Sequence, residues 1–167
     1  MKSARADLLR VVAGSLALLF AGVWLGGIVV LGALVAPTVF RVVPAPTSAD
    51  AMTIVFTHFD KLAMMSAAVI AVAEVVRTRA EPRATLVDVA RLAVIAVAGG
   101  LAVVQGVWLS PTIVALHRQG AIRGLGPLGE KLERFHAWSE TCGKTESLLL
   151  VVLIVLLVRA LTDPRSA

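Results

Sequence analysis

The stretch VVAGSLALLFAGVWLGGIVVLGALV, residues 11–35, contains 25 residues without a charged side chain. A helix rises about 1.5 Å per residue, so this run is long enough to cross the roughly 30 Å hydrocarbon core of a bilayer with some tilt. The basic residues before it resemble the start of a secretory signal peptide, but the apolar run is longer than the ~7–15 residues of such a signal. We therefore predict an uncleaved membrane-spanning helix.

The composition of the whole chain also indicates a membrane protein. Of its 167 residues, 58% are hydrophobic and 16% are charged, whereas about 25% are charged in soluble domains. The net charge is +5, but the basic residues lie between apolar runs and are not interleaved with aromatics, so we expect no nucleic-acid partner. The absence of Asn and Tyr and the preference for Arg over Lys favour a bacterial source. We expect one membrane domain over residues 1–167, with the lipid bilayer as its main partner.

Three later apolar runs predict further crossings. We predict membrane spans over residues 11–35, 53–76, 86–109 and 143–161, and an amphipathic helix over residues 127–142. The amphipathic helix leads directly into the last span. The fold class predicted is therefore all-α, an integral membrane four-helix bundle whose long fourth helix has an amphipathic half outside the membrane.

The turns between these helices are predicted from prolines and capping residues. Three prolines predict a non-helical connection over residues 36–46, and Ser110–Pro111 predicts the end of the third helix. Residues 116–129, rich in glycine, predict an irregular outer connection. Thr85, with Asp88 three residues later, predicts a capping box at the start of the third helix.

Small residues predict how the helices pack. Gly22 and Gly26 form a GxxxG pair in the first helix. Gly100 and Gly106 give the third helix small residues on its surface. Small residues let helix backbones approach closely in membranes. We therefore expect the first and third helices to pack directly against each other.

The distribution of Lys and Arg predicts the orientation. The N-terminus, the connection between the second and third spans, and the C-terminus together hold nine of these residues near span ends, against five, or seven with Lys61 and Lys144, on the opposite side. Cytoplasmic segments carry the excess of positive charge. We therefore expect a multi-pass protein of the inner membrane with both termini in the cytoplasm.

Polar residues gather on the outer side of the predicted membrane, and five of them form the candidate cluster: His58, Asp60, Gln105, His136 and Glu140. The others on that side are Lys61, His117, Lys144 and Glu146. Polar groups at membrane depth are unfavourable unless they face the bundle interior or water, so these residues are candidates for a functional site. His136 and Glu140 are four residues apart on one helix face, a spacing that lets two side chains reach one metal ion. With His58 and Asp60 they define a candidate site for a divalent metal or haem.

Three other interpretations of these residues stay open. They can form a hydrogen-bond network that positions the second and fourth helices. Asp60 can pair with Lys144 or His136 as a structural ion pair, or such a group can form a relay that moves protons or binds an ion. Nucleophile triads, P-loops and dinucleotide-binding motifs are missing, and Cys142 is the only cysteine. We therefore lean towards a protein that is not an enzyme and expect no cofactor, with haem or a divalent metal as the alternative.

Several motifs resemble those of one family. The shared positions are Trp24, Gly26, Gly27, Pro37 and Phe40 in and after the first span, and Pro111, His136 and Ser139 later in the chain. This pattern is similar to bacterial members of a domain-of-unknown-function family resembling transmembrane protein 205, and more distantly to copper-resistance D-like four-helix membrane proteins. The resemblance implies a compact four-helix membrane protein, and the family offers no settled activity.

The expected function has two forms. The leading one is a polytopic inner-membrane protein that is not an enzyme and binds a membrane partner, a second copy of itself or a small solute. The alternative is a membrane redox protein or a metal- or haem-handling protein that uses the outer His, Asp and Glu residues. The broader group of four-helix membrane proteins that the first-helix pattern resembles also includes a haem-associated protoporphyrinogen oxidase, and that resemblance implies histidines within the helices. This chain has none in its first or third span, so the sequence favours the first form.

Overall fold

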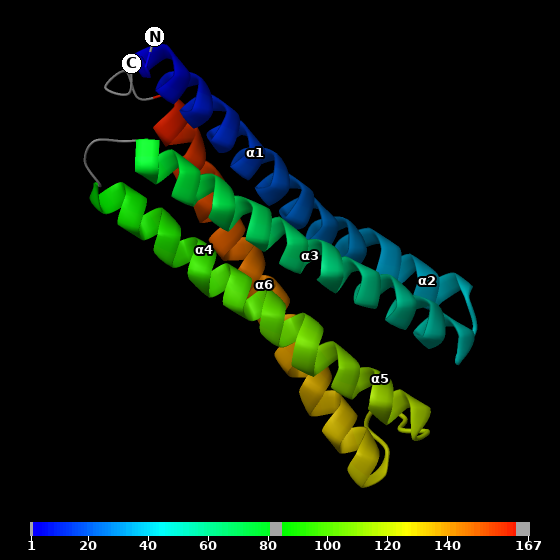
Figure 1. Cartoon of the computed structure of the whole chain (residues 1–167). Coiled ribbons are helices and arrows are strands. Elements are labelled where there is room, and N and C mark those ends of the chain that lie inside the picture. The colour runs from blue at the N-terminus through cyan, green and yellow to red at the C-terminus, as the bar shows by residue number, and fades with distance from the viewer. Residues whose placement is uncertain (1, 81–84, 163–167) are drawn as a thin grey trace.

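The computed structural model describes residues 2–80 and 85–162, and every regular element within these ranges is a helix (Figure 1). The elements are α1 (Lys2–Val30), the π-helix η1 (Leu31–Val35), α2 (Ala36–Val42), α3 (Thr47–Ala80), α4 (Leu86–Val104), the π-helix η2 (Gln105–Leu109), α5 (Ser110–Arg118) and α6 (Gly126–Thr162). They join end to end into four rods. Rod 1 is α1–η1–α2, rod 2 is α3, rod 3 is α4–η2–α5 and rod 4 is α6.

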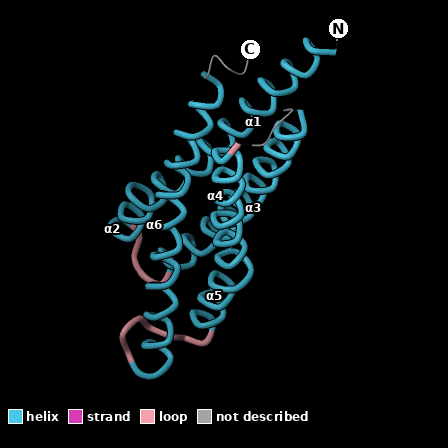
Figure 2. The backbone as a smooth tube through the Cα atoms, turned by 90° about the vertical axis from the view of Figure 1, so that its left-hand side faces the viewer, coloured by secondary structure: helices cyan, strands magenta, loops and turns pink. Residues whose placement is uncertain are grey.

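The four rods pack side by side, and consecutive rods run in opposite directions (Figures 1 and 2). α1 contacts α3 and α6, and α4 contacts the same two helices from the other side. Rods 1 and 3 are therefore diagonal, and the prediction that the first and third helices pack directly together is wrong. The reason is that Gly22 and Gly26 face away from other helices, since an added Cβ would meet nothing within 4 Å at either position. The glycines of α1 that admit a neighbour are Gly27, where a Cβ would overlap the Phe59 ring of α3, and Gly14, which faces Leu161 of α6.

Three segments are long and apolar enough to cross a membrane. They are Asp7–Val42, Leu86–Arg118 and Gly126–Thr162, which correspond to rods 1, 3 and 4. α3 is not among them, and it carries Asp60, Lys61 and Glu74 within its length. The fold is thus all-helical over the described residues and compatible with a membrane protein.

A π-helical turn precedes a proline in both rod 1 and rod 3. A proline lacks a backbone N–H, and its ring clashes with the carbonyl four residues earlier in an α-helix. In rod 1, the N–H of Ala36 instead reaches back five residues to the Leu31 carbonyl, directly before Pro37. In rod 3, the same bond joins Ser110 to the Gln105 carbonyl, directly before Pro111. The wider turn lets each helix continue through its proline.

These π-helical turns overturn two predictions. Residues 36–46 are not a non-helical connection throughout, because α2 is helical to Val42 and the chain turns only over residues 43–46. Ser110–Pro111 does not end the third helix, because α5 continues to Arg118. The irregular outer connection is therefore limited to residues 119–125, and α6 then runs unbroken as the long final helix.

Rods 1 and 3 also resemble each other in sequence around these turns. Residues 32–39 read GALVAPTV and residues 106–113 read GVWLSPTI, 74 residues apart. The buried positions Ala17, Ala21 and Trp24 of α1 lie the same distance before the buried Arg91, Ile95 and Ala98 of α4. The two diagonal rods therefore occupy equivalent places and have their π-helical turns at equivalent points.

The core of the bundle consists mostly of small and aliphatic side chains. Ala17, Ile70, Ala98 and Leu150 have no exposed surface, and they come from all four rods. Large apolar side chains cover the outside, including Leu19 at 60% and Val97 at 53% exposure. A bundle that is apolar on its exterior as well as in its core is suited to lipid rather than water.

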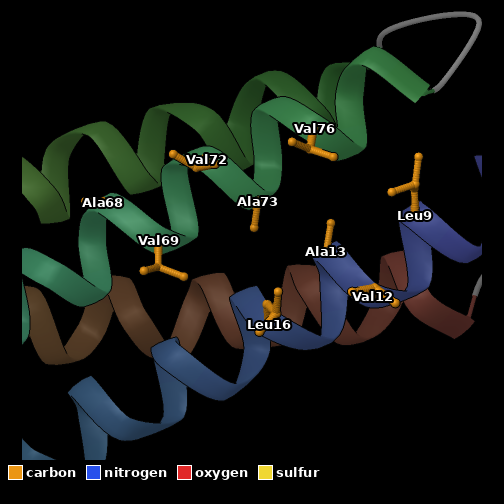
Figure 3. Close-up of a pocket in the computed structure, with 9 residues that line it drawn as sticks. All are labelled: Leu9, Val12, Ala13, Leu16, Ala68, Val69, Val72, Ala73 and Val76. Carbon is orange, nitrogen blue, oxygen red and sulfur yellow. The ribbon is translucent and has the colours of Figure 1, made fainter.

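A shallow groove of about 390 Å³ lies on this exterior between α1 and α3 (Figure 3). Its walls are formed only by aliphatic side chains, namely Leu9, Val12, Ala13 and Leu16 of α1 and Ala68, Val69, Val72, Ala73 and Val76 of α3. No polar side chain lines it, so the groove offers no group for chemistry. The candidate site lies instead among the buried polar residues of the bundle.

Candidate functional site: a central polar cluster

Glu146 is the first member of a group of polar side chains within the bundle. It lies on α6 with 4% of its surface exposed, and its Oε2 accepts a hydrogen bond from Trp24 Nε1 of α1 at 3.2 Å. Its other oxygen, Oε1, is buried and has no hydrogen-bond partner among the described residues. A buried carboxylate oxygen without a donor is unfavourable, so this atom calls for a ligand, a water or a proton.

Gln105 links rod 3 to rod 4, which also carries Glu146. Its Nε2 donates to Ser139 Oγ of α6 at 2.7 Å and to Ser110 Oγ of α5 at 3.2 Å. Both donors of the amide are directed at these serines, so its Oε1 is left as an acceptor, and it too lacks a partner within the described part of the chain. The amide therefore presents an oxygen, not an N–H, to any bound group.

Asp60 of α3 completes the group. Its side chain hydrogen-bonds to Ser110, and its Oδ2 is buried without a partner in the residues described. Asp60 and Glu146 lie close enough for their charges to interact. We define the central polar cluster as Trp24, Asp60, Gln105, Ser110, Ser139 and Glu146. It draws on all four rods.

The π-helical turn η2 positions this cluster locally. Gln105 is the first residue of η2, and Ser110 follows its last residue. Gly106 brings the backbone of this turn against α3, because an added Cβ would lie 3.2 Å from Asp60 Cβ and 2.9 Å from Met64 Cε. π-helical turns are often found at functional sites. Here the turn needed to pass Pro111 also places an amide and a hydroxyl beside Asp60.

The structure brings together only two of the five predicted outer residues, Asp60 and Gln105. His58 is exposed, and its Nδ1 lies 2.9 Å from the Ile54 carbonyl oxygen of its own helix. His136 packs against the His117 ring at a centroid distance of 5.8 Å.

Glu140 is exposed as well and forms an ion pair with Lys144 at 2.7 Å. Lys144 is therefore not placed as the counter-ion of Asp60. Within the described ranges, no group of three or more His, Cys, Asp or Glu residues is arranged to hold a metal ion. His58, Asp60, His136 and Glu140 do not form one site in this structure.

The family-motif residues have different roles in the structure. Trp24 and Ser139 belong to the central polar cluster, and Pro37 and Pro111 follow the two π-helical turns. Gly27 makes room for Phe59, whereas an added Cβ at Gly26 would meet no other atom. Phe40 is 56% exposed, and His136 lies beside His117.

Glu146 is among the polar residues expected on the outer side, but it is not one of the five predicted site residues. One feature of the sequence pointed to it, since Glu146 lies seven residues after Ser139 and therefore on the same face of one helix. Its hydrogen bond to Trp24 joins residues 122 positions apart in the chain. Such a contact is visible only once the rods are packed.

A second buried charged group lies where α3 and α4 meet, and we call it the arginine clamp. It consists of Glu74, Arg77, Asp88 and Arg91, with 0–6% of each side chain exposed. Arg77 Nε lies 3.0 Å from Glu74 Oε1, Arg91 Nε lies 3.0 Å from Glu74 Oε2, and both arginines reach Asp88. Two acids and two bases leave no net charge, so the clamp is a structural group rather than a binding site.

Thr85 ties the clamp to the start of α4. Its hydroxyl accepts from the Asp88 N–H, and its own N–H donates to Asp88, which is the capping box that the sequence predicted. Asp88 thus fixes the helix start and holds two arginines at once.

Polar and aromatic side chains also gather at the opposite end of the bundle from the clamp. Trp108 of η2 lies 5.7 Å from Phe135 and 5.9 Å from Trp138 between ring centroids. The two tryptophans are about half exposed. Half-exposed tryptophans are typical of the region where a membrane meets water.

The fold and the site define a class of protein: an all-helical bundle with apolar helices compatible with a membrane, and a buried polar cluster at its centre. The chain belongs to the family described as Domain of unknown function (DUF4149), whose match covers residues 19–122. No curated protein and no solved structure matches the chain. The family match includes Trp24, Asp60 and Gln105 of the central polar cluster, and it ends before Ser139 and Glu146 of α6.

Proposed function

We propose that the chain is a bacterial polytopic inner-membrane protein that crosses the membrane four times with both termini in the cytoplasm. Support for the fourth crossing comes from α3, which starts where rod 1 ends and returns along it to the start of α4 (Figure 1). Because rods 1 and 3 are long and apolar enough to cross, α3 between them has to traverse the same thickness. The Lys and Arg excess near the clamp end supports the orientation.

We also propose that the family relationship extends to proteins resembling transmembrane protein 205. The support is the set of motif residues: Trp24 and Ser139 lie in the central polar cluster, and Pro37 and Pro111 lie at the two π-helical turns.

Within this framework the protein is not an enzyme, and it binds a small solute at the central polar cluster. The observation that carries this proposal is the set of oxygen atoms without partners: Asp60 Oδ2, Gln105 Oε1 and Glu146 Oε1. Lipid cannot satisfy these groups, and a purely structural network would pair them with donors. The alternative, a haem or metal site built on histidine, has less support because none of the three histidines lies in the cluster.

Buried apolar side chains lie on both sides of the cluster along the bundle. Towards the clamp, the cluster is followed by the buried apolar side chains of Ile70, Ala98 and Leu153 and then by the arginine clamp itself. These layers close that route. At the other end lie the buried side chains of Leu109, Leu132 and Phe135, so in this conformation the protein is not an open channel.

A stability screen tests the proposed function. The purified protein is heated in detergent micelles with separate members of four solute classes: chloride salts, sugars, amino acids and amines. We expect at least one class to raise the melting temperature of the wild type and of Glu130→Gln, an exposed control on the same helix. The shift should be absent in Glu146→Gln. If no class shifts the wild type, or if Glu146→Gln responds equally, the cluster does not bind such a solute.

A further inference from the structure

We infer that the solute bound by the central polar cluster is a hard cation held by oxygen atoms. This inference rests on the proposed function and names the chemical class of its ligand. The observations behind it are the balance of donors and acceptors, the charge of the cluster and the kind of atoms that it offers.

The cluster has a surplus of hydrogen-bond acceptors. Its N–H donors are already used, since Trp24 Nε1 donates to Glu146 and Gln105 Nε2 donates to Ser139 and Ser110. The remaining unpaired atoms of its carboxylates and amide are all oxygens. A ligand that fits must therefore supply positive charge or donors and cannot be an anion.

The charge of the cluster also favours a positively charged ligand. Asp60 and Glu146 are 5% and 4% exposed, and neither forms an ion pair within the residues described. Two neighbouring acids in an apolar bundle are strongly unfavourable without a counter-charge. The lysine nearest to Glu146 in sequence, Lys144, is instead exposed and paired with Glu140, and Lys61, next to Asp60, is exposed as well. One divalent cation, or one monovalent cation together with one proton, balances the two carboxylates.

The ligand atoms select the type of cation. Carboxylate, amide and hydroxyl oxygens suit hard cations such as Na⁺, Mg²⁺ and Ca²⁺, whereas imidazole and thiolate suit zinc and copper. The cluster contains two carboxylates, one amide oxygen and two serine hydroxyls, and the histidines lie elsewhere. The site therefore differs from the histidine-based metal site that the spacing of His136 and Glu140 suggests.

Isothermal titration calorimetry tests the inference. The full chain in detergent is titrated separately with NaCl, MgCl₂ and CaCl₂ at constant ionic strength, with choline chloride as the balancing salt. We expect one of the three to give a saturable heat with one site per chain. Glu146→Gln and Asp60→Asn should each weaken this binding by at least about tenfold, because the affinity of oxygen-liganded sites depends on the number of charged ligands. Glu130→Gln should bind as the wild type does.

Each outcome of the titration either supports or overturns the cation inference. No saturable heat with any of the three salts overturns the inference, as does a heat that both carboxylate variants retain. If either variant fails to fold, as judged by circular dichroism and gel filtration, Gln105→Leu provides the decision, since it removes one neutral ligand and should weaken binding. Another outcome is that a sugar or amine raises the melting temperature only when Glu146 is present, while none of the three salts gives a saturable heat. This result keeps the proposed function and overturns only the inference that the ligand is a cation.

Discussion

The arginine clamp allows the most quantitative prediction. Arg91→Leu removes the guanidinium whose Nε lies 3.0 Å from Glu74 Oε2 and which also bonds Asp88, and it leaves two acids facing one arginine. Removing one partner of a buried ion pair generally destabilises a protein by about 3–5 kcal/mol. Glu74 keeps its bonds to Arg77 at 3.0 and 3.2 Å, so we expect the lower end, about 3 kcal/mol.

The assay is reversible unfolding in mixed micelles, followed by circular dichroism. A loss of about 3 kcal/mol corresponds to roughly two powers of ten in the unfolding equilibrium constant. Arg79→Leu is the control, since Arg79 is an exposed arginine on the neighbouring helix α3 and its loss should change stability by less than about 0.5 kcal/mol. The double variant Glu74→Leu/Arg91→Leu keeps the charge balanced and should regain at least half of the loss. A loss below about 1 kcal/mol for Arg91→Leu, or no recovery in the double variant, would mean that the clamp does not stabilise the bundle as a buried ion-pair network.

Two further predictions concern packing and topology. Gly27→Ala should be less stable than Gly26→Ala by about 1–3 kcal/mol in the same unfolding assay, because both gain helix propensity but only the first meets an aromatic ring; equal stabilities would contradict this packing. In a Cys142→Ser background, Gln119→Cys should react with a membrane-impermeant maleimide in intact cells, whereas Arg79→Cys should react only after lysis. Labelling in the reverse order would place the termini outside.

The helices could be predicted from the sequence because apolar runs and capping residues determine helix formation through local interactions. Residues 11–35 lie within rod 1, the capping box at Thr85 and Asp88 forms as predicted, and α6 is one long helix. The failures occur at prolines. A π-helical turn before Pro37 or Pro111 leaves no clear mark in a single sequence, since the extra residue is accommodated by the backbone and not by a particular side chain.

Only part of the candidate site could be predicted from the sequence. Asp60 and Gln105 stood out because they are polar residues in apolar helices, and both lie in the central polar cluster. The spacing of His136 and Glu140 correctly placed them near each other on one helix, but spacing cannot tell which way that face turns. Contacts with α5 turn His136 towards His117, and Glu140 remains exposed. Rotation of a helix about its axis is set by its neighbours, so it requires the packed structure.

The most direct test of the central claim is anomalous X-ray diffraction from crystals soaked in strontium chloride or rubidium chloride, the heavier analogues of calcium and the alkali ions. We expect an anomalous peak within about 3 Å of Asp60 Oδ2 and Glu146 Oε1 in at least one of the two soaks. Glu146→Gln crystals should lose that peak. Crystals that bind neither ion between these carboxylates, or in which the two side chains point away from each other, would contradict the central claim.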